Sequence, residues 1–271
     1  MVRHWQEATS SHLTKLVRNP SFGLITDVDG TISPIVEDPA KSKVTAGNHA
    51  LLKALTQHLP LVAAISGRDA KTLFRLVGIP GMVYVGNHGL EQWQNSAILG
   101  HPQIASFRPS LLSAKNSIET LRLAGVWVED KHATITIHYR QSPDPQATAQ
   151  SLEGAAKKTA FEHGLAYFSG RMIFELRPPL EINKGTALID LIQERGLQAS
   201  LYLGDDTTDV DAFKAARRLR KNDQCSSWSV GVVSRESPEA VVEAADFLAQ
   251  GVSDVEALLT WLLSERMASS T

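Results

Sequence analysis

The chain has 271 residues, of which 43% are hydrophobic and 21% charged, and its formal net charge is −2. This balance is typical of a globular protein of one large or two modest domains, and it provides no basic field for nucleic acid or an anionic membrane. A single cysteine, Cys225, excludes an internal disulfide and a zinc site built from several cysteines.

Short apolar runs alternate with amphipathic segments of helical period in the first and last thirds of the chain. The predicted strands are 22–26, 61–65, 82–85, 200–203, 229–233 and 245–248. The predicted helices are 46–58, 70–77, 184–195, 209–220, 238–244 and 253–264. This alternation predicts an α/β fold in which a parallel sheet is covered by helices on both faces.

The middle of the chain follows another pattern. Its predicted elements are a helix at 104–124, strands at 126–129 and 133–139, a helix at 147–163, and strands at 165–168 and 172–176. In the second strand, Thr134, Thr136 and His138 alternate with apolar residues, which is the period of a sheet with one wet face. The order αββαββ predicts an inserted α+β domain at 102–179, with proline-marked boundaries and a core of 1–101 and 180–271.

Polar segments follow four of the predicted core strands. These segments are Asp27 with Asp29, Ser66 to Asp69, Gly86 to Gly89, and Gly204 to Asp209. In open parallel sheets, ligands bind beyond the carboxyl ends of the strands. We therefore expect the four segments to form one site.

The first segment ends an apolar run in two carboxylates, Asp27 and Asp29, followed by Gly30. If the strand continues, residues two apart share a face, and two neighbouring anions indicate a counter-cation such as Mg²⁺. A carboxylate nucleophile, a proton-carrying carboxylate and a hard cation suit phosphoryl transfer. We predict that Asp27 forms an aspartyl-phosphate and that Asp29 serves as acid and base. The alternative is a strand that ends in an acidic surface turn.

Two further residues are suited to binding an anion. Ser66 offers a hydroxyl and backbone N–H groups at a helix start, and Lys184 can reach a phosphate from the start of helix 184–195. The alternatives are a simple helix cap and a solvated lysine. A serine-hydrolase motif is not satisfied because Ala64 replaces its first glycine, and the residues after Lys184 reverse the order of a Walker A loop.

Three carboxylates, Asp205, Asp206 and Asp209, crowd one strand-to-helix turn. Oxygen ligands on a short loop suit Mg²⁺, although a helix N-cap also explains such acids and explains Asp209 best. An EF-hand loop is excluded because Val210 stands at its glycine position and Ala216 at its final glutamate position.

Candidate substrate contacts come from both predicted domains. In the core they are Gly67, Arg68, Asn87 and His88. In the inserted domain they are Glu129, Lys131, Arg140, Arg171 and Glu175, charged groups that can bind sugar hydroxyls but also fit a solvated sheet face. For Trp127, Tyr139 and Phe174 we expect packing; the alternative is stacking on a sugar.

Four segments occur in an order that resembles the motifs of haloacid dehalogenase-like (HAD) phosphatases. They are Asp27-Val28-Asp29-Gly30-Thr31, Ser66, Lys184, and Gly204-Asp205-Asp206 with Asp209. Further segments resemble trehalose-6-phosphate phosphatases: Gly86-Asn87-His88-Gly89-Leu90-Glu91, Glu129-Asp130-Lys131, His138-Tyr139-Arg140, Glu175-Leu176-Arg177-Pro178 and Asn183-Lys184-Gly185. The resemblance covers essentially the whole chain and implies a Rossmann-like core with a C2B-type cap.

The resemblance also implies how the site is built. Mg²⁺ would be bound by Asp27, the backbone oxygen of Asp29, and Asp205, with Asp206 and Asp209 supporting these ligands. Glu129, Lys131 and Glu175 match positions that grip trehalose when the cap closes. Many relatives have glutamate after the last motif aspartate, where this chain has Val210.

The predicted function is Mg²⁺-dependent hydrolysis of trehalose 6-phosphate to trehalose and phosphate. The alternatives are another sugar phosphate (sucrose 6-phosphate, a glucosylglycerol phosphate or mannosyl-3-phosphoglycerate), a phosphosugar mutase, and a non-enzymatic phosphosugar sensor. The apolar runs are too short to span a bilayer, and the first residues lack a secretory signal. We therefore expect a cytoplasmic protein, a monomer, whose partner is a small sugar phosphate rather than nucleic acid or a membrane.

Overall fold

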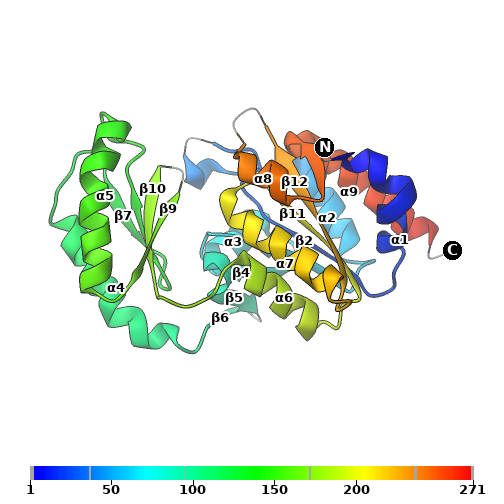
Figure 1. Ribbon diagram of the computed structural model, residues 1–271, viewed down its shortest axis with the longest axis horizontal. Helices are drawn as coiled ribbons and strands as arrows, with labels where there is room; N and C mark the ends of the chain where they lie inside the picture. Colours follow the sequence, from blue (N-terminus) through cyan, green and yellow to red (C-terminus); the bar gives the residue numbers. More distant parts are fainter. Residues whose placement is uncertain (1–2, 37, 95, 171, 235–236, 270–271) are drawn as a thin grey trace. The chain divides into compact units, whose positions relative to one another are not determined.

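Figure 1 shows the computed structural model of the protein, which describes residues 3–36, 38–94, 96–170, 172–234 and 237–269. The chain divides into two compact units, one of residues 1–98 and 182–271 and one of residues 99–181. The inserted domain predicted at 102–179 lies within the second unit. In the described part of the chain, no helix combines the length and apolar character needed to cross a membrane.

The first unit is built around a sheet with the strand order β1-β13-β12-β11-β2-β3-β4-β5-β6. These strands are β1 (Arg3–His4), β2 (Phe22–Thr26), β3 (Leu61–Ile65), β4 (Val83–Gly86), β5 (Glu91–Gln94), β6 (Ala97–Gly100), β11 (Ala199–Gly204), β12 (Ser226–Val233) and β13 (Phe247–Gln250). Neighbours from β1 to β4 pair in parallel, whereas β4 and β5 pair antiparallel. The parallel sheet predicted from the sequence is confirmed.

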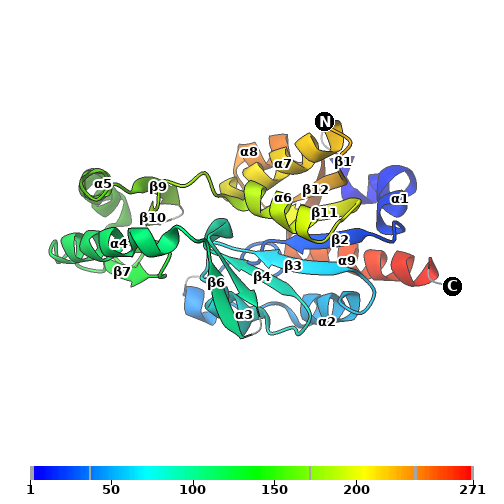
Figure 2. The same cartoon turned by 90° about the horizontal axis from the view of Figure 1, so that it is seen from below.

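Helices cover both faces of this sheet (Figure 2). They are α1 (Thr14–Val17), α2 (Ala46–Leu55), α3 (Ala70–Val77), α6 (Lys184–Glu194), α7 (Val210–Lys221), α8 (Glu239–Ala244) and α9 (Gly251–Ala268). Helices α1, α2, α3 and α9 contribute to one apolar core, and α6, α7 and α8 contribute to the other. All five residues of β2 are buried, because a central parallel strand is covered on both sides.

Local capping fixes the two helices that carry site residues near their starts. The Asp69 side chain accepts a hydrogen bond from the Thr72 N–H at the start of α3, which ends at Gly78 in the left-handed conformation. Asn183 caps α6 by accepting from the N–H groups of Gly185 and Thr186. This cap places Lys184 in the first turn of its helix.

The second unit contains an antiparallel sheet with the strand order β7-β8-β10-β9 and two helices (Figure 1). The elements are α4 (Ile104–Glu119), β7 (Trp127–Asp130), β8 (Ile135–His138), α5 (Pro145–Glu162), β9 (Ala166–Gly170) and β10 (Ile173–Arg177). Its core joins Leu111 of α4 and Leu152 of α5 to Ile135, Ile137 and Phe174 of the sheet. The predicted αββαββ order is confirmed.

Several elements of the first unit were not predicted from the sequence. Strand β1 is only two residues long, and β5 is a polar segment without a clear apolar period. The short helical turns from Trp5 to Val17 were also missed. In the second unit, α4 ends at Glu119, earlier than predicted, and the chain then passes through residues with positive φ at Arg122 (47°) and Gly125 (70°).

Candidate active site

The four polar segments meet at one edge of the core sheet, because they follow the neighbouring strands β11, β2, β3 and β4. The Asp27 N–H donates to the Leu203 carbonyl at 2.8 Å, which joins the end of β2 to β11. The Ser66 N–H donates to the Val85 carbonyl at 2.9 Å, which joins the end of β3 to β4. The expected convergence is therefore present in the fold.

A buried lysine connects two of the aspartates. Lys184 Nζ lies 3.1 Å from Asp27 Oδ1 and donates to Asp209 Oδ1 at 2.8 Å. Asp209 Oδ1 also accepts from the Tyr202 hydroxyl at 2.6 Å, and its Oδ2 accepts from the N–H groups of Asp205 and Asp206 at 3.0 Å each. Asp209 thus holds both the lysine and the backbone of the acidic turn.

Three carboxylates form a compact acidic group. One oxygen from each of Asp27, Asp205 and Asp209 lies within 4.8 Å of the others. Burial, opposed in part by Lys184, raises the pKa of Asp27 well above its ordinary value. Burial and the charge of Asp209 raise the pKa of Asp205 to about 7, against the lowering effect of Lys184. The charged forms of Asp27 and Asp205 are therefore unfavourable until further positive charge arrives.

The chemistry of this group fits a hard cation. All the atoms that could bind a metal ion are carboxylate oxygens, those of Asp27, Asp205 and Asp209. Against these three carboxylates stands one ammonium group, that of Lys184. Thr31 Oγ1 donates to Asp205 Oδ1 at 3.1 Å and orients it. Gly30 has φ +89°, and a Cβ there would lie 1.9 Å from Asp205 Oδ2, so only glycine lets this carboxylate approach the turn.

The spacing of the two aspartates predicted that the Asp29 side chain lies beside that of Asp27, but its hydrogen bonds come from other residues. Strand β2 ends at Thr26, just before Asp27, and Asp29 forms an isolated parallel bridge with Ser33. Asp29 instead accepts two hydrogen bonds from Arg68, from Nε at 2.6 Å and Nη2 at 2.8 Å, and one from Ser42 Oγ at 2.8 Å. Burial acts to raise the pKa of Asp29, but the hydrogen bonds and charge of Arg68 outweigh it and lower the pKa.

The segments Ser66 to Asp69 and Gly86 to Gly89 are joined by hydrogen bonds. The Ser66 hydroxyl accepts from the Arg68 N–H at 3.2 Å, and the Ser66 carbonyl accepts from the His88 N–H at 2.9 Å. The Asn87 N–H donates to the Arg68 carbonyl at 2.8 Å. A Cβ on Gly67 would lie 2.7 Å from His88 Nε2, so these loops are in close contact. Arg68, predicted to bind substrate, is engaged by Asp29 in this structure.

Two of the predicted substrate residues of the second unit, Glu129 and Glu175, share one sheet face. Glu129, Thr136 and Glu175 lie opposite one another in register across β7, β8 and β10. Glu175 Oε1 accepts from Thr134 at 3.0 Å and Thr136 at 3.3 Å, and Lys131 Nζ lies 3.7 Å from it. Glu129 Oε2 lies 2.9 Å from His138 Nε2. Arg140 follows β8 and is half-buried, and Arg171 lies outside the described residues.

Some residues of this face were not predicted from the sequence to belong to the site. Arg177 donates through Nε to Glu175 Oε2 at 2.6 Å and lies over the Phe168 ring. Trp127 is 45% exposed, so the expectation that it packs in the core was wrong, whereas Tyr139 and Phe174 are buried as expected. A period of two along β7 would have placed Trp127 beside Glu129.

Comparison with known proteins identifies the family. A model of the trehalose-phosphatase family matches residues 25–248. The chain belongs to the trehalose-phosphatase family. This trehalose-phosphatase family member is 34% identical over 243 residues to the trehalose-phosphate phosphatase of Mycobacterium avium, an alignment that covers 82% of the chain and 61% of the relative. The chain thus spans about three fifths of that relative's length.

Solved structures share the fold of this trehalose-phosphatase family member. The C-terminal domain of trehalose-6-phosphate phosphatase from Candida albicans aligns with a TM-score of 0.80 at 21% identity, covering 97% of this chain and 98% of that one. A haloacid dehalogenase-like hydrolase from Bacteroides thetaiotaomicron aligns with a TM-score of 0.58 at 15% identity, covering 89% and 99%. The resemblance to the HAD fold inferred from the motifs is confirmed.

Proposed function

We propose that the protein is a Mg²⁺-dependent phosphatase that converts trehalose 6-phosphate to trehalose and phosphate. The observation that carries the proposal is the buried contact between Asp27 and Lys184 beside two further carboxylates at the end of the sheet. The match to the trehalose-phosphatase family supports the choice of substrate.

Asp27 is the proposed nucleophile. Its carboxylate attacks phosphorus and the sugar oxygen leaves, so that one difficult step is divided between formation and hydrolysis of an aspartyl-phosphate. Lys184 holds the carboxylate at 3.1 Å and contributes positive charge where the phosphoryl group carries negative charge. The hydroxyl of Ser66 and the nearby backbone N–H groups are proposed to bind the phosphoryl oxygens.

Asp29 is the proposed acid and base. As acid, its carboxylate must first take up a proton, against the lowered pKa that Arg68 imposes, and gives it to the leaving sugar oxygen; it then takes a proton from the water that hydrolyses the aspartyl-phosphate. Its hydrogen bonds from Arg68 and Ser42 fix the direction of its carboxyl group. We propose that Arg68 acts mainly by positioning Asp29, in place of the direct substrate contact predicted from the sequence.

The residues that would hold Mg²⁺ are Asp27, Asp205 and the backbone oxygen of Asp29, supported by Asp206 and Asp209. A cation held by these residues would supply positive charge against the phosphoryl group and the crowded carboxylates. The Asp209 carboxylate already accepts hydrogen bonds from Lys184, Tyr202 and the Asp205 N–H, which favours a role in positioning the metal ligands.

The second unit is proposed to be the C2B-type cap that selects the substrate. Glu129, Lys131 and Glu175 offer charged hydrogen-bonding groups on one sheet face, which suits a molecule rich in hydroxyls. Gly67, Asn87 and His88 are proposed to contact substrate from the first unit.

Phosphate release is the experiment that tests this function. Purified protein is incubated with trehalose 6-phosphate, sucrose 6-phosphate, glucosylglycerol phosphate and mannosyl-3-phosphoglycerate, each with Mg²⁺ or with a chelator. We expect Mg²⁺-dependent release with the highest kcat/KM for trehalose 6-phosphate. A higher kcat/KM for another compound would overturn the substrate, and an isomerised phosphosugar without free phosphate would overturn hydrolysis.

A further inference from the structure

Trp127 is a large aromatic residue on the polar face of the second unit's sheet, and its side chain is 45% exposed. We propose that its indole is a stacking platform for a pyranose ring of the sugar phosphate and that His138 and Glu129 brace it. This inference rests on the proposed function, because it names how the same substrate is recognised.

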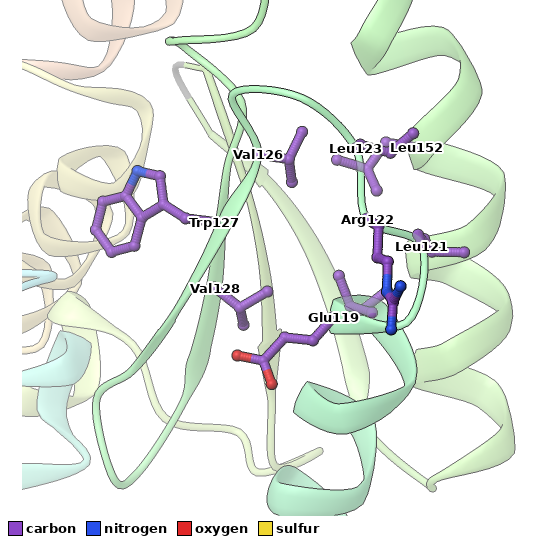
Figure 3. A pocket seen from close by; sticks show the side chains of 9 residues that line it. Glu119, Leu121, Arg122, Leu123, Val126, Trp127, Val128 and Leu152 are labelled. Carbon is purple, nitrogen blue, oxygen red and sulfur yellow. The ribbon is translucent and has the colours of Figure 1, made fainter.

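The apolar core of the unit does not account for the position of Trp127. The core lies on the opposite face of the sheet, where Ile137 and Phe174 pack against the helices. A cavity of about 280 Å³ is lined by Leu121, Leu123, Val126, Leu152 and neighbouring residues, Trp127 among them. Figure 3 shows the indole of Trp127 pointing away from these leucines, to the other side of β7.

Neighbouring side chains fix the orientation of the indole, which lies parallel to the His138 ring. Trp127 pairs directly with His138 across β7 and β8, and their rings are stacked with centroids 3.9 Å apart and an interplanar angle of 4°. His138 Nε2 in turn lies 2.9 Å from Glu129 Oε2. Because the indole is fixed before a ligand arrives, little rotamer freedom remains to be lost on binding.

The surroundings of the indole match the chemistry of a sugar. A pyranose ring has an apolar C–H face and a rim of hydroxyl groups, so it is recognised by an aromatic surface beside hydrogen-bonding groups. Glu129, Thr136 and Glu175 form the adjacent row of the same sheet face, and Lys131 Nζ is 3.7 Å from Glu175. Trp127 thus supplies the apolar surface next to the polar row.

Three variants test the platform. Trp127→Ala removes the aromatic surface, Trp127→Phe keeps a smaller ring, and Phe161→Ala is the matched control because Phe161 is an aromatic of α5 that is 87% exposed. With trehalose 6-phosphate we expect Trp127→Ala to raise KM about tenfold and change kcat by less than about twofold, since stacking holds ground state and transition state alike. Trp127→Phe should raise KM by about threefold, and Phe161→Ala should change neither constant.

Binding of trehalose itself gives a second readout that does not depend on turnover. We expect trehalose to change the tryptophan emission saturably in the unmodified protein and in Phe161→Ala, and to leave Trp127→Phe without this response. An unchanged KM in Trp127→Ala, or an intact emission response in Trp127→Phe, would overturn the platform. Absence of phosphate release from trehalose 6-phosphate in the unmodified protein would instead overturn the proposed function, while the emission response would still decide the role of Trp127.

Discussion

The ammonium of Lys184 lies 3.1 Å from the Oδ1 atom of Asp27, and both side chains are buried at the carboxyl end of the central strand. Burial acts to lower the pKa of Lys184, but the charges of Asp209 and Asp27 outweigh it and raise the pKa above its ordinary value. The lysine therefore stays charged at neutral pH and holds Asp27, the proposed nucleophile, in place.

Replacing the nucleophile should abolish turnover without unfolding the protein. In Asp27→Asn, we expect kcat for trehalose 6-phosphate to fall by at least about a thousandfold, because an amide does not attack phosphorus. Lys184 keeps its hydrogen bond to Asp209, so the melting temperature should change by only a few degrees. Phosphate assays and thermal unfolding measure the two effects, and phosphate release at the unmodified rate would rule out Asp27 as the nucleophile.

Gly30 should control metal binding more than stability. A Cβ in Gly30→Ala would lie 1.9 Å from Asp205 Oδ2, so the carboxylate must move away from its place in the acidic group. We expect the Mg²⁺ concentration for half-maximal activity to rise about tenfold to a hundredfold. Gly196→Ala is the control, because Gly196 also has a positive φ, +59°, but nothing lies within 4 Å of its added Cβ. Equal Mg²⁺ requirements in the two variants would contradict the role given to Gly30.

Arg68 should affect the chemical step rather than substrate affinity. Arg68→Ala removes both hydrogen bonds from the guanidinium to Asp29, so the acid and base loses its orientation. We expect kcat to fall about tenfold to a hundredfold with little change in KM. Arg68→Lys keeps the charge but not the paired hydrogen-bond geometry, so its kcat should lie between those of Arg68→Ala and the unmodified protein. A raised KM at unchanged kcat would return Arg68 to direct substrate binding.

The stability of the N-terminal segment should depend on pH through Asp254. Its carboxylate accepts from the Gln250 N–H at 2.7 Å and the Trp5 indole N–H at 3.0 Å, and lies 2.7 Å from His4 Nε2. Burial acts to raise the pKa of Asp254, but these hydrogen bonds outweigh it and lower the pKa. A lowered folded-state pKa means that the stabilisation is present above the unfolded-state pKa of about 4 and is lost as the pH falls through the folded-state value.

Unfolding of Asp254→Asn measures this contribution. At pH 7 we expect the variant to be less stable than the unmodified protein by about 1 kcal/mol, the size of a hydrogen bond to a charged group at a partly exposed site. The difference should shrink as the pH is lowered below about 4. A difference in the free energy of unfolding that stays constant between pH 7 and pH 3 would contradict the assignment.

The fold and the acidic part of the site were predictable because they depend on local patterns. Asp27 follows β2 and the acidic turn at Asp205 follows β11, and these strands lie side by side, so the general rule for parallel sheets places the two segments together. The partner of Asp29 was not predictable, since Arg68 is 39 residues away and the pairing depends on how two loops pack. The face of Trp127 was predictable, because successive strand residues point to opposite faces and Trp127 therefore lies on the face opposite Val126 and Val128.

The central claim is that Asp27 is esterified to phosphorus during turnover, and the stereochemistry at phosphorus tests it most directly. A phosphorothioate analogue of trehalose 6-phosphate, made chiral with oxygen isotopes, is hydrolysed in water of a third isotope, and the configuration of the released thiophosphate is determined. Two successive in-line displacements, first by Asp27 and then by water, predict retention of configuration. Inversion would show that water attacks the substrate directly and would contradict the account.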